Sequence, residues 1–102
     1  MHSMNKTLSN KQKKQLERLG HSLQPVVMIA DQGLKETVVA ATNEALDTHE
    51  LIKIRVRADD REARDDLIRK LCEETESEQV GQIGFTALLF RRNRKKPVID
   101  LV

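Results

Sequence analysis

The chain has 102 residues, enough for one hydrophobic core but not for two. Charged residues make up 33% and apolar residues 38%, and the apolar ones recur with the periods of helices and strands, which excludes a disordered chain. The single cysteine, Cys72, excludes an internal disulfide and a cysteine-based zinc site. No apolar run approaches the roughly 18 residues of a membrane span, and residues 1–14 lack the apolar stretch of a secretory signal. We therefore expect a cytoplasmic protein without membrane association.

Charge is unevenly distributed along the chain. The net charge is only +2, yet residues 59–78 carry nine acids and four bases, a local charge of −5. The rest of the chain carries fourteen bases and seven acids, a charge of +7. This segregation favours one face that binds a polyanion. Because Phe85 and Phe90 are the only aromatic residues, a protein that reads single strands by stacking bases on exposed rings is disfavoured.

The first predicted element is a helix over residues 10–19. Ser9 and Gln12 form the Ser-x-x-Gln pattern of a capping box, and Gly20 is a natural C-terminal stop. Only two leucines supply its apolar stripe, so we expect this helix at the edge of the domain.

A strand and a second helix follow. Pro25 precedes four consecutive apolar residues, 26–29, which predict a strand buried on both faces. Asp31, Gln32 and Gly33 predict a tight turn. Helical spacing then begins and extends to near Thr48, with an inner side formed by Leu34, Val38, Ala41, Ala45 and Leu46.

Residues 51–57 alternate strictly between apolar and basic side chains. This pattern predicts a strand with Ile52, Ile54 and Val56 on one face and Lys53, Arg55 and Arg57 on the other. Asp59 or Asp60 then caps a third helix that extends to about Glu76. Its predicted inner face consists of Ala63, Leu67, Leu71 and Cys72.

The remaining chain is predicted to be mostly extended. Val80 and Ile83 precede Gly84, residues 86–90 predict a strand, and residues 98–101 predict a short last strand at an edge. Strand–helix–strand units favour parallel neighbours, and the closing hairpin adds antiparallel ones. The sequence therefore predicts an α/β domain of two layers, a mixed sheet with helices packed mainly on one face.

Three groups of cations are candidate phosphate contacts. Lys53, Arg55 and Arg57 would project from one sheet face about 6–7 Å apart, close to the repeat of a phosphate chain. The other groups are a loop with Arg91, Arg92, Arg94, Lys95 and Lys96, and the first helix with its approach, with Lys6, Lys11, Lys13, Lys14 and Arg18. Each group has an alternative interpretation as solvated surface.

A fourth candidate phosphate site lies at the start of the second helix. Gly33 stands just before it, where free backbone N–H groups and the helix dipole favour an anion. We include the adjacent Gln32 and Lys35 in this candidate site. Phe85, beside Gly84, either offers a stacking surface or packs in the core.

Signals of an enzyme are weak. The sequence contains no recognisable Ser, His and acid arrangement and no phosphate-binding P-loop, so we expect no catalytic residue, metal ligand or cofactor. The pairs Asp59-Asp60 and Asp65-Asp66 could hold a divalent cation in a hydrolase, but helix caps and a solvated helix face explain them better.

A family resemblance rests on short motifs in a fixed order. They are Leu-x-Pro-Val-Val-Met-Ile at 23–29, Gly33-Leu34, His49-Glu50-Leu51-Ile52-Lys53-Ile54, Asp60-Arg61-Glu62, Gln82-Ile83-Gly84 and Leu88-Leu89-Phe90-Arg91. Over roughly residues 7–101 the chain resembles the YhbY family, the bacterial stand-alone form of the CRM domain.

The resemblance implies a fold and a function. The fold would be αβαβαββ with a four-stranded mixed sheet, similar to the C-terminal domain of translation initiation factor three. Residues 9–102 would form a single CRM-type RNA-binding domain after a flexible segment, 1–8. The protein would bind ribosomal RNA in precursors of the large ribosomal subunit, without catalytic activity, cofactor or small-molecule substrate. Specificity would come mostly from RNA shape.

The resemblance also implies a Gly-x-x-Gly loop that is likened to the phosphate-clamping loop of KH domains. The matching residues are Ala30-Asp31-Gln32-Gly33. Alanine replaces the first glycine and Asp31 adds a negative charge, so only Gly33 matches the pattern and the basic surfaces are expected to bear more of the binding.

A second hypothesis from a different class is a protein-interaction adaptor. The acidic third helix would dock a basic ribosomal protein, and the −5 charge of residues 59–78 motivates it.

Overall fold

The computed structural model describes residues 8–30 and 33–102. Its elements are α1 (Asn10–Gly20), β1 (Pro25–Ile29), α2 (Glu36–His49), β2 (Leu51–Val56), α3 (Arg61–Thr75), β3 (Glu78–Ile83) and β4 (Thr86–Phe90). The strands form one sheet in the order β1-β2-β4-β3, with β1 and β2 parallel and the other neighbours antiparallel. The αβαβαββ fold with a four-stranded mixed sheet is thereby confirmed. Residues 1–7 of the expected flexible segment, and Asp31 and Gln32 of the expected turn, lie outside the described residues.

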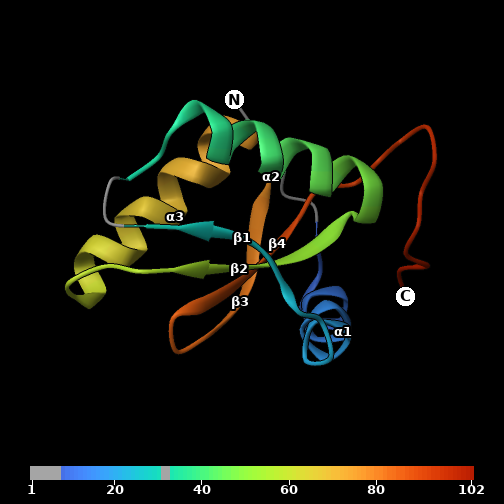
Figure 1. The fold of residues 1–102 in the computed structure, drawn as a ribbon. Coiled ribbons are helices and arrows are strands. Elements are labelled where there is room, and N and C mark those ends of the chain that lie inside the picture. Colours follow the sequence, from blue (N-terminus) through green and yellow to red (C-terminus); the bar gives the residue numbers. More distant parts are fainter. Residues whose placement is uncertain (1–7, 31–32) are drawn as a thin grey trace.

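The sheet separates two hydrophobic clusters of unequal size. Figure 1 shows α2 on one side of the sheet and α1 on the other. The larger cluster joins the sheet to α2 and α3, and contains Val27, Ile29, Leu46, Ile52, Ile54, Val56, Ile68, Leu71, Ala87 and Leu89. The smaller one lies on the opposite face under α1, and contains Leu16, Leu51, Val80, Leu88 and Phe90. Two of the three described helices therefore share one face, and α1 covers part of the other.

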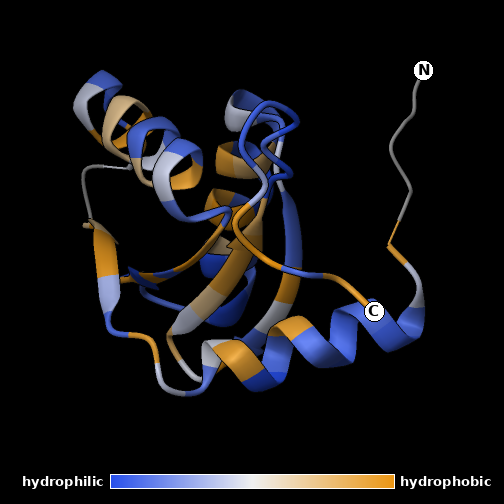
Figure 2. Ribbon diagram, turned by 90° about the vertical axis from the view of Figure 1, so that its right-hand side faces the viewer, coloured by the Kyte–Doolittle hydropathy of each residue, from blue (hydrophilic) through white to orange (hydrophobic). Residues whose placement is uncertain are grey.

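The predicted capping box of α1 is present. The Ser9 hydroxyl accepts from the Gln12 N–H at 3.1 Å, and the Gln12 side chain accepts from the Ser9 N–H at 2.9 Å. Most of the helix is hydrophilic (Figure 2), and the fully buried Leu16 anchors it. Gly20 lies against Leu88 so closely that a Cβ there would come within 2.4 Å of a Leu88 methyl. This contact holds α1 at one end of the sheet.

The predicted last strand is wrong, because residues 98–101 form no strand in the described chain. Side chains bind the tail instead. The Gln15 amide donates to the Asp100 carbonyl at 2.8 Å and accepts from the Val102 N–H at 2.9 Å. The Gln12 amide donates to the Val102 carbonyl at 3.0 Å. With these groups satisfied, the tail does not need a neighbouring strand.

The prediction that β1 is buried on both faces is also wrong. Val27 and Ile29 are buried against the helices, but Val26 and Met28 are each 54% exposed. β1 is an edge strand, and the cluster under α1 contains neither of these two side chains. A run of apolar residues looks the same in sequence whether one face or both are covered.

The inner faces of α2 and α3 are shifted from the prediction. Ala41 and Ala63 are exposed, whereas Thr42, Ile68 and Thr75 are buried. Thr42 and Thr75 donate their hydroxyls to the carbonyls of Val38 and Leu71, both at 2.8 Å, so that burial costs little. Among the described residues, no helix is both long and apolar enough to cross a membrane.

Candidate nucleic-acid interface

The half of the sheet that α1 leaves uncovered carries both cations and apolar side chains. Met28, Arg55, Thr86 and Ile83 are in register across all four strands. Cross-strand partners project on the same side, and Arg55 lies on the side opposite the buried Ile54 and Val56. We call this surface, with Val26, Lys53, Arg57 and Phe85, the open sheet face.

The three cations predicted on one strand face are brought together here. Lys53 is half-buried and Arg55 is exposed, both on β2. Arg57 lies just beyond β2, but its N–H donates to the Ile29 carbonyl at 2.8 Å, which continues the β1–β2 ladder. None of the three forms a salt bridge with another described residue. Their charge is therefore available to an external anion.

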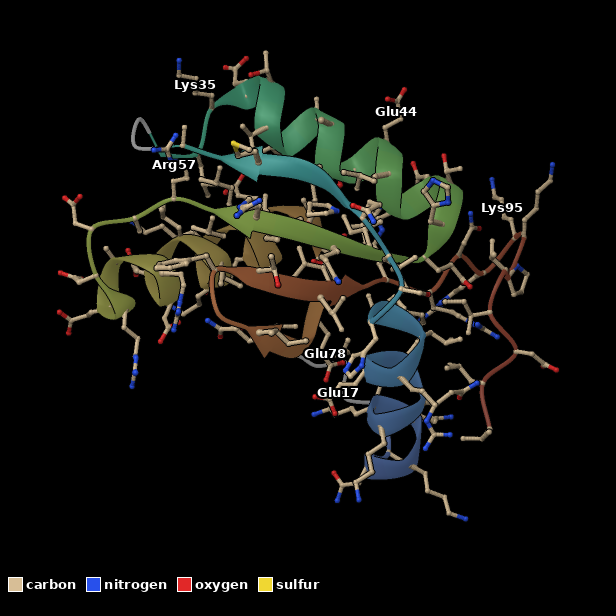
Figure 3. All side chains as sticks on the ribbon, turned by 60° about the horizontal axis from the view of Figure 1, so that its bottom comes forward. Glu17, Lys35, Glu44, Arg57, Glu78 and Lys95 are labelled. Carbon is tan, nitrogen blue, oxygen red and sulfur yellow. The ribbon has the colours of Figure 1, made fainter. Side chains whose placement is uncertain are left out.

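The start of α2 lies at the same end of the molecule. Figure 3 shows Lys35 and Arg57 at this end. Gly33 has φ +87°, the left-handed region that favours glycine, and its N–H donates to the Ala30 carbonyl at 3.0 Å. Lys35 occupies the N-cap position without a side-chain cap, which leaves the first N–H groups of α2 uncapped. Glu36 in the first turn adds a negative charge, and Gln32 lies outside the described residues.

The cations of the loop at residues 91–96 fall into two groups, one bound within the protein and one exposed. Arg91 is bound inside the protein: it donates to the Asn43 side chain, the Thr75 carbonyl and Asp47, each at 2.7 Å. Arg92 donates to the Ile99 carbonyl at 2.6 Å and to Glu50 at 3.4 Å. The exposed group, without a described salt bridge, consists of Arg94, Lys95 and Lys96. Lys95 lies at the opposite end of the molecule from Arg57 (Figure 3).

The reasoning from sequence missed Glu50, which organises this loop. Glu50 is fully buried, has φ +64°, and accepts backbone N–H groups from Asn93 at 2.6 Å and from Val98 and Ile99 at 2.8 Å. Burial raises the pKa of its carboxyl, but these N–H groups and the charge of Arg92 outweigh burial, and the net pKa is lowered. The sequence signal that could have identified Glu50 is a carboxylate at the end of a predicted helix, where glycine is usual.

The two aromatic residues have different environments. Phe90 is 5% exposed and belongs to the cluster under α1, whereas Phe85 is 57% exposed at the β3–β4 turn. Phe85 therefore does not pack in the core. It lines a hollow of about 540 Å³ together with Met28, Arg55, Val56, Arg57, Ala58 and Asp59.

The remaining charged surfaces lie on α1 and α3. Lys11, Lys14 and Arg18 are exposed on α1, while Lys13 forms a salt bridge with Glu78 at 3.3 Å, and Lys6 is outside the described residues. On α3, Arg69 binds Asp66 and Glu73, and Lys70 also binds Asp66. The side-chain hydrogen bonds from Arg69 and Lys70 lower the pKa of Asp66.

The paired acids have structural roles where the structure shows contacts. The Asp60 side chain caps α3 by accepting from the Ala63 N–H at 2.8 Å, and Asp65 binds Arg64 at 3.3 Å. Within residues 8–30 and 33–102, no group of three or more potential metal ligands occurs.

Known proteins share this sequence and fold. The model of the CRS1 / YhbY (CRM) domain matches residues 8–91. A Pseudomonas aeruginosa protein named as a probable RNA-binding protein is 42% identical over 88 residues, 86% of this chain and 85% of that protein. An RNA-binding protein of Haemophilus influenzae is 42% identical over 92 residues, 90% of this chain and 93% of that protein.

A solved structure has the same fold as this chain. The solution structure of a hypothetical Staphylococcus aureus protein, described as a candidate RNA-binding protein, matches with a TM-score of 0.81 at 30% identity, and covers 94% of this chain and 100% of that one. These names describe RNA binding rather than a catalytic reaction. The chain belongs to the CRS1 / YhbY (CRM) domain family.

Proposed function

We propose that this protein binds ribosomal RNA in precursors of the large ribosomal subunit and assists ribosome maturation. The observation that carries the proposal is the open sheet face, where Lys53, Arg55 and Arg57 are aligned and form no salt bridge with another described residue. The relatives named as RNA-binding proteins support the choice of RNA. The choice of ribosomal RNA follows from the resemblance of the sequence motifs to the YhbY family.

In this proposal, most contacts are made to phosphates. Arg55 and Arg57 bind one backbone segment. The uncapped N–H groups at the start of α2, which follows Gly33, bind the next, because both surfaces lie at one end of the molecule (Figure 3). Arg94, Lys95 and Lys96 extend the footprint to the other end, and Lys11 and Lys14 extend it along α1. Arg91 and Arg92 hold the loop, since their guanidinium groups are engaged within the protein.

The proposal is tested by measuring affinity over a salt series. The ligands are a structured fragment of large-subunit ribosomal RNA and a DNA duplex of equal length. Each phosphate contact should contribute roughly 0.7 to 0.9 to the slope of log affinity against log salt. We expect a slope of several units and a clear preference for the structured RNA. Weak and equal binding to both ligands would contradict the proposal.

The adaptor hypothesis has a narrower basis. Asp59, Asp60, Glu62, Glu74 and Glu76 form no salt bridge with another described residue, so the region around α3 keeps an acidic surface. Arg69 and Lys70 neutralise the middle of the helix, however. A pull-down from nuclease-treated lysate separates the two functions, since partners that persist after RNA removal would favour the adaptor.

A further inference from the structure

Four large apolar side chains are exposed on the open sheet face. Val26 and Met28 of β1 are each 54% exposed, and Ile83 and Phe85 are 55% and 57% exposed. The sheet register aligns Met28 with Ile83 through the intervening strands. Soluble proteins leave such side chains exposed singly, and a group on one surface indicates a binding site.

Hydrogen bonds hold the backbone of the β3–β4 turn that carries Phe85. The Phe85 carbonyl accepts from the Val56 N–H at 2.8 Å, and the Gly84 carbonyl accepts from Arg64 at 2.9 Å. A backbone hydrogen bond and the Arg64 guanidinium therefore hold the turn, and the Phe85 ring is more than half exposed. A ligand that stacks on Phe85 would lose little entropy in ordering this turn.

The hollow beside Phe85 combines apolar walls with cations. Met28 and Phe85 supply a thioether and an aromatic face, while Arg55 and Arg57 supply two guanidinium groups. Its volume of about 540 Å³ is in the range of pockets that hold small molecules. Asp59 also lines it, and its carboxylate can accept hydrogen bonds from amino groups.

We propose that this hollow binds one unpaired base of the RNA, with the base against Phe85 and Met28 and the flanking phosphates on Arg55 and Arg57. The inference rests on the RNA binding proposed above and adds one base site to it, on the exposed Phe85, where the sequence alone disfavoured base stacking. A base has two apolar faces and a polar edge with amino or carbonyl groups, which matches the walls and Asp59.

Charge favours RNA over a peptide as the occupant. The cations continue beyond the hollow, along β2 to Lys53 and to Lys35 at the start of α2 (Figure 3). A nucleotide chain carries a phosphate on each side of every base, and so would meet cations on entering and on leaving the hollow. A peptide would need acidic residues at both positions.

The test uses the absence of tryptophan and tyrosine from the chain. In the Phe85→Trp variant the introduced indole is the only strong fluorophore. We expect its emission to be quenched at saturation by an RNA stem-loop with an unpaired loop, and not by a fully paired RNA duplex with the same number of phosphates. The control is Ala41→Trp, an exposed position on α2, whose emission should not respond to either RNA.

A second variant measures the same contact by affinity. Phe85→Ala should weaken stem-loop binding roughly 5- to 150-fold, the range for losing one base stack, and leave duplex binding unchanged. Because the ring is more than half exposed, both variants at position 85 should keep the wild-type thermal unfolding midpoint.

The outcomes separate the base site from RNA binding itself. Quenching by the stem-loop alone, with selective loss in Phe85→Ala, supports the site. Steep salt-dependent RNA binding with unchanged indole emission and unchanged Phe85→Ala affinity would overturn it, and would assign this apolar surface to a protein partner. Failure of the wild-type protein to bind either RNA would overturn both proposals.

Discussion

The cations of the open sheet face and those of the loop at residues 91–96 look alike in sequence but not in the structure. Arg55 and Arg57 form no salt bridge with another described residue, whereas Arg91 and Arg92 donate to carboxylates and carbonyls of the protein itself. The number of basic residues in a segment therefore does not give the charge available to a ligand. The acceptors that the fold brings close to each cation decide how much charge is available, and most of them come from distant elements.

The largest effect is expected when the acceptor that organises the loop is changed. Glu50→Gln should lower the free energy of unfolding by about 3 kcal/mol, because a buried carboxylate that accepts three backbone N–H groups is replaced by an amide with one acceptor oxygen. Urea denaturation measures the loss. Glu44→Gln, at an exposed position on α2, is the control and should be neutral. Equal midpoints for the two variants would contradict the role of Glu50.

Arg91 should matter for stability and not for RNA. Arg91→Gln removes a half-buried guanidinium that joins α2 to the end of α3, and should cost about 2 kcal/mol in free energy of unfolding. The salt dependence of RNA binding should stay that of the wild type. A reduced slope with full stability would place Arg91 in the RNA interface and remove the contrast with the open sheet face.

The open sheet face should show the reverse behaviour. Arg55→Gln with Arg57→Gln should change the free energy of unfolding by less than about 0.5 kcal/mol. The same double variant should reduce the salt slope by roughly 1.4 to 1.8. Arg69→Gln with Lys70→Gln removes the same charge from α3 and is the matched control, with a smaller expected change in slope. Equal losses in the two double variants would mean that net charge alone drives binding.

The smallest effect concerns pH. The pKa of Glu50 is lowered from its ordinary value of 4.5, so its stabilising contribution is fully present above pH 4.5 and is lost as the pH falls through the lower, folded value. The difference in unfolding free energy between the wild type and Glu50→Gln should therefore shrink below pH 4.5. Denaturation curves over an acidic pH series would show this, and a constant difference would contradict it.

The parts of the fold with a local signal could be predicted from the sequence. The alternation in β2 determined which side chains face the helices, and the capping box marked the start of α1. Coverage of a strand is not local: Val26 and Val27 have the same chemistry, but only Val27 lies under a helix. The buried threonines of α2 and α3 were missed because a hydroxyl bonded within its own helix does not appear in an apolar pattern.

The candidate site was predictable to the same degree. The row Lys53, Arg55 and Arg57 follows from period two, so its position on one face could be inferred. The internal bonds of Arg91 could not, because its partners on α2 lie more than 40 positions earlier in the chain. The sequence could not decide whether Phe85 packs in the core or offers a stacking surface, because its exposure depends on how the β3–β4 turn lies against its neighbours.

The attachment of the tail to α1 has a topological consequence. The Gln12 side chain donates to the Val102 carbonyl at 3.0 Å, so the first helix of the domain and its last described residue are neighbours in space. A segment whose two sides lie this close together can be inserted into a loop of a host protein, or joined into a tandem array, without a long linker and without disturbing its sheet.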